Sequence, residues 1–211
     1  MKGGSKDAEI KKYADAIKAM APHKIMFLVD YEPDLYVPGA KKTTAGTPQD
    51  YKDMWKNFVR IFEDNQVENV VWAMDYSYDI RDTPELLIEL WPDDNVVEWL
   101  FFNVFQFRKV NDPEGKGDCP GGLKKIYQDL EDGIDSVPEW ADIPWGLGAW
   151  GSDGTNKWLP LKDREHCLDG VAEILSDGEY PKLKASVYFN SLKGRIDEDM
   201  SPDLLPAFNA L

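Results

Sequence analysis

The sequence has few of the residues that most often hold metals or covalent cross-links. Its 211 residues include two cysteines, Cys119 and Cys167, and two histidines, His23 and His166. The cysteines permit one disulfide, but their spacing is not that of a metal site, and two free thiols are the interpretation we prefer. Neither histidine stands in a ligand pattern such as H-E-x-x-H. The sequence therefore predicts no metal site and no cofactor.

Long apolar runs and an excess of positive charge are also missing. No run approaches the roughly 20 apolar residues that span a bilayer, and residues 1–6 contain no apolar segment of a signal peptide. The chain carries 39 acidic against 24 basic residues, a net charge of -15 at pH 7, so its surface repels polyphosphate backbones. We expect a soluble chain without a visible targeting signal, which neither inserts into membranes nor binds nucleic acid.

Phosphate-binding loops are absent as well. The glycine-rich stretch at residues 115–122 is interrupted by Cys119 and Pro120. It matches neither the G-x-G-x-x-G nor the G-x-x-x-x-G-K-[ST] pattern. Nucleotide binding therefore has little support.

The residues that are present alternate between helical and strand patterns. Hydrophobic residues make up 43% of the chain, which is enough for one compact domain. The periodicity predicts helices at residues 7–20, 47–62, 84–90, 123–133, 162–175 and 202–210, and strands at residues 25–29, 70–74, 96–107, 145–150 and 183–189. This alternation predicts an α/β fold with a parallel sheet, either doubly wound or part of a barrel.

Acidic, aromatic and amide side chains gather where the predicted strands end. These candidates are Asp30, Tyr31, Glu32, Asp75, Tyr76, Asn103, Phe105, Trp150, Asp153, Tyr188 and Asn190. Parallel α/β folds place functional loops at these carboxyl ends. Aromatic faces stack on sugar rings, and carboxylates bind hydroxyls or transfer protons. The pattern favours a polysaccharide or oligosaccharide site, while the alternative is that the acids cap helices and solvate loops.

Several segments resemble the family 26 glycoside hydrolases, which are β-mannanases and related enzymes with (β/α)8 barrels. They are residues 27–33 (FLVDYEP), 46–51 (GTPQDY), 68–72 (ENVVW), 91–99 (WPDDNVVEW) and 145–151 (WGLGAWG). The resemblance implies a single polysaccharide-active domain over residues 1–211, of the mannan endo-1,4-β-mannosidase type. Its first strand corresponds to the fourth of the barrel, so the first three strands are lacking. An extracellular location follows if the resemblance holds and the N-terminus is truncated.

The resemblance also assigns roles at the site. Glu32 falls on the family's general acid/base, with Tyr31 where the family has a histidine. Ala149 falls on the nucleophilic glutamate, and Phe105 falls on a tyrosine that supports this nucleophile. Because retaining hydrolysis needs two carboxyl groups about 5 Å apart, the resemblance implies an impaired or inactive glycosidase. Ala149 is either natural or engineered, and the three departures together favour natural degeneration.

Other interpretations stay open. Asp30, Asp75 or Asp153 is the second carboxylate if catalysis has been rewired. Tyr31, Trp72, Tyr76, Phe105, Trp150, Tyr188 and Asn190 are the candidate substrate-binding residues. The alternative function is a non-catalytic glycan-binding or structural assembly subunit. Since a barrel of shear eight cannot close on five strands, open sheet edges predict a partner chain or self-association.

Overall fold

The computed structural model describes residues 6–36, 46–77, 84–92, 96–106, 124, 127–128, 131–132, 142–152, 169–176 and 178–188. The elements follow the order α1 (Asp7–Lys18), β1 (Ile25–Leu28), the 3-10 helix η1 (Pro33–Leu35), α2 (Pro48–Asp64), β2 (Val70–Ser77), α3 (Pro84–Leu90), β3 (Trp99–Gln106), β4 (Trp145–Ser152) and β5 (Leu183–Tyr188). Residues 169–176 are also helical. The predicted alternation is confirmed over these ranges, and the predicted helix at residues 202–210 lies outside them.

The five strands form one parallel sheet, in which their spatial order is also their order in the sequence. β1 pairs in parallel with β2, with Phe27 beside Trp72, and β4 pairs in parallel with β5. Sequential parallel strands are typical of (β/α)8 folds, whereas a doubly wound sheet reverses its strand order at a switch point. The fold is therefore the predicted partial (β/α)8 type.

The chain divides into two compact units, Met1–Phe101 and Phe102–Leu211, and the division falls inside β3. The expectation of a single domain over residues 1–211 stays a prediction. Among the described residues, no helix combines the length and apolarity that crossing a bilayer requires.

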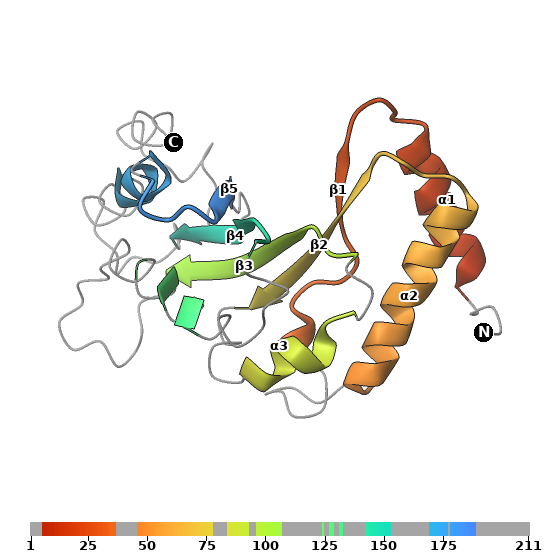
Figure 1. Ribbon diagram of the computed structural model, residues 1–211, viewed down its shortest axis with the longest axis horizontal. Helices are drawn as coiled ribbons and strands as arrows, with labels where there is room; N and C mark the ends of the chain where they lie inside the picture. Colours follow the sequence, from red (N-terminus) through yellow and green to blue (C-terminus); the bar gives the residue numbers. More distant parts are fainter. Residues whose placement is uncertain are drawn as a thin grey trace. The chain divides into compact units, whose positions relative to one another are not determined.

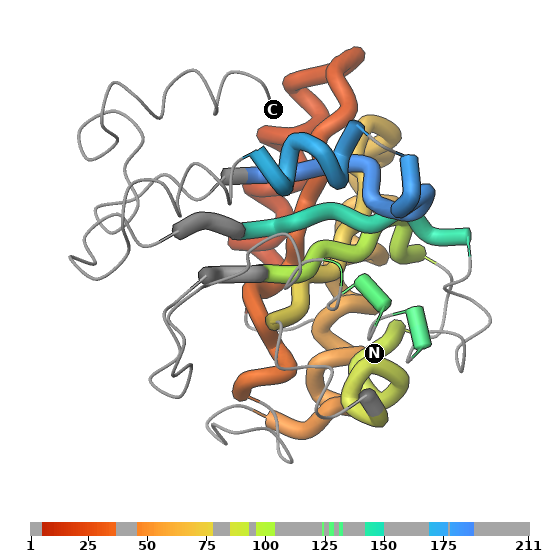
Figure 2. The backbone as a smooth tube through the Cα atoms, turned by 90° about the vertical axis from the view of Figure 1, so that its left-hand side faces the viewer, coloured from red at the N-terminus to blue at the C-terminus, as the bar shows by residue number. Residues whose placement is uncertain are grey.

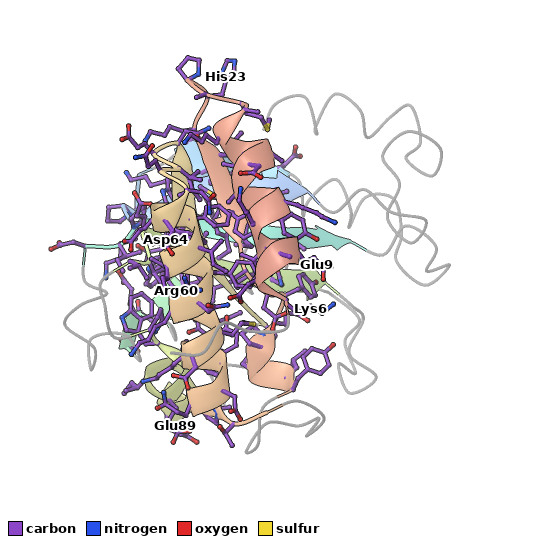
Figure 3. All side chains as sticks on the ribbon, turned by 90° about the vertical axis from the view of Figure 1, so that its right-hand side faces the viewer. Lys6, Glu9, His23, Arg60, Asp64 and Glu89 are labelled. Carbon is purple, nitrogen blue, oxygen red and sulfur yellow. The ribbon has the colours of Figure 1, made fainter. Side chains whose placement is uncertain are left out.

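Helix α2 begins where its capping residues predict. The Thr47 hydroxyl accepts a hydrogen bond from the Asp50 backbone N–H at 3.2 Å, and the Asp50 carboxylate accepts one from the Thr47 N–H at 2.7 Å. This reciprocal capping box satisfies two backbone donors that the first turn leaves open. Helices α1 and α2 lie side by side (Figure 1). On α2 the exposed Arg60 and Asp64 form an ion pair at 2.8 Å (Figure 3).

Aromatic side chains form the core of the first unit. The Trp72 ring lies 4.8 Å from Phe62, 5.7 Å from Trp55 and 5.8 Å from Phe27, measured between ring centroids. Trp55 is fully buried and Phe62 nearly so. These contacts join β1 and β2 to α2, because alternate side chains of each strand point toward the helix.

The second unit has an aromatic core of its own. Trp145 of β4 is 1% exposed and packs against Phe102 and Tyr127, whose ring centroids lie 5.6 Å and 5.0 Å away. The Lys182 ammonium lies 5.2 Å from the centre of the Trp145 ring, within the range of a cation–π contact. β4 and β5 run side by side next to the helix at residues 169–176 (Figure 2). The core therefore fixes the start of β4, four residues before Ala149.

Candidate functional site

The segment after β1 carries the predicted acid Glu32 in an unusual backbone conformation. The Asp30 carboxylate accepts a hydrogen bond from the Tyr31 N–H at 2.9 Å. Glu32 then has φ 49° and ψ 54°, in the left-handed region. Few residues other than glycine adopt this conformation, which costs about 1–3 kcal/mol and is enriched at functional sites, although Gln66 after α2 also has a positive φ of 55°. The local geometry therefore sets Glu32 apart from an ordinary loop residue.

The 3-10 helix η1 follows Glu32 at once and is tied to the end of β2. Asp34 is 4% exposed, and its carboxylate accepts hydrogen bonds from the Ser77 backbone N–H, at 2.9 Å, and from the Ser77 hydroxyl. η1 also contacts α3. Sequence reasoning missed Asp34 and Ser77. Pro33, directly after Glu32, could have predicted the start of η1, since proline is favoured in the first turn of a helix.

Three of the predicted site residues come together electrostatically. Burial above all, together with the negative charges of Glu32 and Asp75 and a hydrogen bond with Glu32, raises the pKa of Tyr31 to about 12. The Tyr31 phenol is therefore a neutral hydrogen-bond donor at physiological pH. The side chain remains 49% exposed. Tyr31 thus offers an open ring face beside two carboxylates.

The other candidates on β2 lie deeper than a binding surface requires. Trp72 is 7% exposed within the aromatic core, and Tyr76 is fully buried with its hydroxyl 3.6 Å from the Met74 sulfur. Both rings are buried here, and their role in stacking on sugars stays a prediction. Asp75 is 2% exposed. Strand alternation places it on the opposite face from its two neighbours.

Ala149 lies in an irregular part of β4. Its N–H donates a hydrogen bond of 2.6 Å to the Asn103 side-chain oxygen, and Asn103 is 3% exposed. The pairing of β4 with β5 shifts register between Leu147 and Trp150. Such irregularities are frequent beside active sites. Ala149 is 8% exposed, and its methyl group supplies no polar atom at this position.

The remaining candidates are described only in part. Asp153 and Asn190 lie outside the described residues. Phe105, Trp150 and Tyr188 belong to β3, β4 and β5 by their backbones, but their side chains also lie outside the description. Within the part of the chain that is described, no group of three or more His, Cys, Asp or Glu residues has the geometry of a metal site.

The buried Asp34 gives the chain a testable pH dependence. Burial raises the pKa of Asp34 to about 6, against the lowering effect of the hydrogen bonds from Ser77. Because an unfolded aspartate titrates near about 3.9, the folded chain binds this proton more tightly. The contribution of Asp34 to the free energy of unfolding is therefore fully present below about pH 4 and lost as the pH rises through about 6.

We expect Asp34→Asn to remove this loss, because the amide still offers Ser77 an acceptor. The free energy of unfolding of the variant should match that of the parent at pH 4 and exceed it by about 2 kcal/mol at pH 7. Urea unfolding at pH 4, 5, 6 and 7 measures both curves. Parallel curves for the two chains would show that Asp34 does not titrate in this range.

The comparisons with known proteins concern the fold. No protein-family model and no curated protein sequence matches the chain. A modular endo-β-1,4-mannanase of glycoside hydrolase family 26 from Cellulomonas fimi matches with a TM-score of 0.64 and 16% identity, over 99% of this chain and 47% of that chain. GH26C from Muricauda sp. MAR_2010_75 matches with a TM-score of 0.65 and 15% identity, over 99% of this chain and 55% of that one.

The similarity extends to another glycoside hydrolase family. A GH51 arabinofuranosidase from Xanthomonas axonopodis pv. citri matches with a TM-score of 0.63 and 10% identity, over 92% of this chain and 45% of that one. The chain thus spans about half the length of these solved structures. It has the fold of part of a glycoside hydrolase barrel, and its function must be argued from its own residues.

Proposed function

We propose that this chain is a glycoside hydrolase-like domain that binds β-linked polysaccharides of the mannan type without hydrolysing them. The observation that carries the proposal is Ala149, a buried methyl group at the position that the resemblance assigns to the nucleophile. Retaining hydrolysis needs a carboxylate there, in addition to the one that Glu32 supplies. The proposal concerns this chain, which spans about half of the barrels that it matches.

Tyr31 and Glu32 are the residues that we assign to glycan contact. The half-exposed Tyr31 ring provides a face for the C–H surface of a sugar. The Glu32 carboxylate beside it accepts hydrogen bonds from sugar hydroxyls, which charge makes stronger than neutral ones. A small open site of this kind supports weak binding, with a Kd in the millimolar range, about -4 kcal/mol.

Rewired catalysis through another described acid is less well supported. Asp75 is 2% exposed, so a sugar would have to displace the side chains that cover it. Burial raises the pKa of Asp30, and this residue precedes Glu32 by two positions on the same segment. Two carboxylates that share one segment seldom reach opposite sides of a glycosidic bond. We therefore assign Glu32 a binding role.

Titration with β-1,4-mannohexaose, followed by NMR, tests the binding. We expect saturable shifts in the parent and affinity about fivefold lower in both Tyr31→Ala and Glu32→Gln, because each change removes about 1 kcal/mol of contact. Asp53→Ala is the matched control, since Asp53 is an exposed acid on α2 that accepts a hydrogen bond from Gln49. Equal affinities in the parent, Tyr31→Ala and Glu32→Gln would show that the glycan does not bind at Tyr31 and Glu32. Absence of saturable binding would refute glycan binding itself.

A role in assembly is the second candidate, and the edge of the sheet favours it. β1 is the terminal strand in the strand order, and its alternate side chains Met26 and Leu28 are 37% and 39% exposed. Exposed apolar edge strands promote association with another chain. We therefore propose that this edge is covered by self-association or by a partner chain.

Light scattering during size-exclusion chromatography measures the association. We expect a mass above the 24.0 kDa of one chain. The double variant Met26→Lys with Leu28→Lys should lower the mass, because edge lysines oppose strand pairing. Ile88→Lys, at a 50% exposed apolar residue of α3, is the control and should leave the mass unchanged. A monodisperse 24.0 kDa parent would exclude self-association.

A further inference from the structure

The backbone of Glu32 is opposed by two local preferences. A non-glycine residue avoids the left-handed region, and a residue before proline prefers an extended backbone. Glu32 adopts φ 49° and ψ 54° although Pro33 follows it. Neither preference is met, so contacts elsewhere in the first unit must hold this conformation.

The contacts made within the turn are limited. The Leu35 N–H donates to the Glu32 carbonyl at 3.0 Å, and the Tyr36 N–H donates to the Pro33 carbonyl at 3.0 Å. A single 3-10 turn of this length has little stability by itself. These two bonds define the shape of η1 but leave its position in the fold to other groups.

Asp34 supplies the contact that fixes this position. Its carboxylate accepts two hydrogen bonds from Ser77, one from the backbone and one from the hydroxyl, at the carboxyl end of β2. Asp34 and Ser77 are 4% and 5% exposed. Both partners are thus shielded from water, where hydrogen bonds to a charged group contribute most and are most costly to break. In Figure 1 the chain after β1 runs past α3, which η1 contacts.

We propose that Asp34 is the positioning residue for Glu32: by anchoring η1 to Ser77, it holds the Glu32 backbone in the left-handed conformation and thereby sets the direction of the Glu32 carboxylate. The inference rests on the proposed function, in which Glu32 contacts the glycan. Asp34 itself is buried and does not touch the ligand.

Replacement of Asp34 separates positioning from other effects. Asp34→Ala loses both hydrogen bonds and leaves the Ser77 N–H buried without its acceptor. The backbone of Glu32 should then relax toward the extended region. Asp34→Asn retains an acceptor for that N–H and a donor for the hydroxyl, so it should rescue the geometry. Asp53→Ala is the control for removal of one negative charge.

The first readout is the Glu32 backbone, from its 13Cα and 13Cβ chemical shifts and its coupling between HN and Hα. We expect left-handed values in the parent, Asp34→Asn and Asp53→Ala, and extended values in Asp34→Ala. Parent-like Glu32 signals in Asp34→Ala would overturn the inference. Extended values in Asp34→Asn would do the same, because the amide preserves the anchoring bonds.

The second readout is the affinity for β-1,4-mannohexaose. Asp34→Ala should bind about fivefold more weakly, as Glu32→Gln does, while Asp34→Asn stays within about twofold of the parent. If Asp34→Ala shows extended Glu32 signals but binds mannohexaose as tightly as the parent, the Glu32 backbone conformation does not determine affinity. If the parent binds no mannohexaose, the proposed function fails, and the Glu32 signals still decide the role of Asp34.

Ser77→Ala covers the case in which Asp34→Ala does not fold. This variant loses the hydroxyl donor and keeps the backbone N–H, so only one of the two anchoring bonds is removed. We expect a smaller displacement of the Glu32 signals in the same direction. Unchanged Glu32 signals in a folded Ser77→Ala chain would overturn the inference.

Discussion

No retaining hydrolysis of β-mannan or mixed-linkage β-glucan is expected from the purified chain. Loss of a covalent nucleophile lowers the rate by several powers of ten, and Ala149 leaves no group to attack an anomeric carbon. Phe105 also lacks the hydroxyl that the resemblance places beside the nucleophile. Release of reducing ends measures the rate, and the expected value is that of the buffer alone.

Restoring the carboxylate at position 149 and the hydroxyl at position 105 tests whether their absence is what prevents hydrolysis. Ala149→Glu combined with Phe105→Tyr returns the carboxylate and the hydroxyl, and the Ala149 N–H that bonds Asn103 is kept. Ala149→Gln with Phe105→Tyr is the matched control, because it adds the same bulk without a nucleophile. Turnover by the first double variant alone would support the assigned position.

Other outcomes of the assay are equally informative. Cleavage by the unmodified chain that Glu32→Gln abolishes would refute binding without hydrolysis. Asp30, Asp75 and Asp153 would then be tested as the second carboxylate. If the restored chain binds mannohexaose but does not cleave it, groups that the other half of a whole barrel supplies become the leading explanation, since the chain spans about half of the barrels that it matches.

Trp72→Ala is expected to lower the free energy of unfolding by about 3–5 kcal/mol. Trp72 is 7% exposed and packs against three aromatic rings, so its removal opens a cavity in the first unit. The cost combines the lost transfer free energy with the cavity that the surrounding rings fill only in part. Urea unfolding followed by circular dichroism measures the change.

Tyr31→Ala is the matched aromatic deletion at an exposed site. Tyr31 is 49% exposed, so its removal should change the free energy of unfolding by no more than about 0.5 kcal/mol. The two variants should therefore separate stability from binding. A loss below about 1 kcal/mol in Trp72→Ala would mean that Trp72 lies nearer the surface than the structure places it.

Much of the fold was predictable because local chemistry determines it. Thr47 and Asp50 form the capping box where the sequence places a helix start, and the predicted helix at residues 84–90 has the bounds of α3. The apolar run of β2 forms a largely buried strand, as in most parallel sheets, whereas alternate side chains of β1, Met26 and Leu28, are 37% and 39% exposed. The alternation of helices and strands predicted a parallel sheet, and the family resemblance, which implies part of a barrel, predicted the sequential strand order.

The direction of the β2 side chains was harder to predict. Residues 70–74 are apolar without interruption, so hydrophobicity alone does not say which alternate positions face the helices. Trp72 and Tyr76 point into the core, and Asp75 between them faces the other way. One further assumption would have resolved this. If Asp75 faces the site, strand alternation places Trp72 and Tyr76 on the other face of β2, away from the site.

The anchoring of η1 was beyond sequence reasoning for a different reason. Asp34 and Ser77 are 43 residues apart and meet only because β1 and β2 are neighbours in the sheet. An aspartate two residues after Glu32 has the sequence pattern of a solvated loop acid. Its burial depends on tertiary contacts, which no local pattern encodes.

Binding and hydrolysis can be followed in one sample by recording the anomeric proton signals of β-1,4-mannohexaose with the chain over several days. Binding without hydrolysis predicts concentration-dependent broadening of the hexaose signals, reduced in Tyr31→Ala and Glu32→Gln, with no new reducing-end signals in any sample. New reducing-end signals that grow with parent concentration and are absent with Glu32→Gln would show that the chain is an active glycosidase.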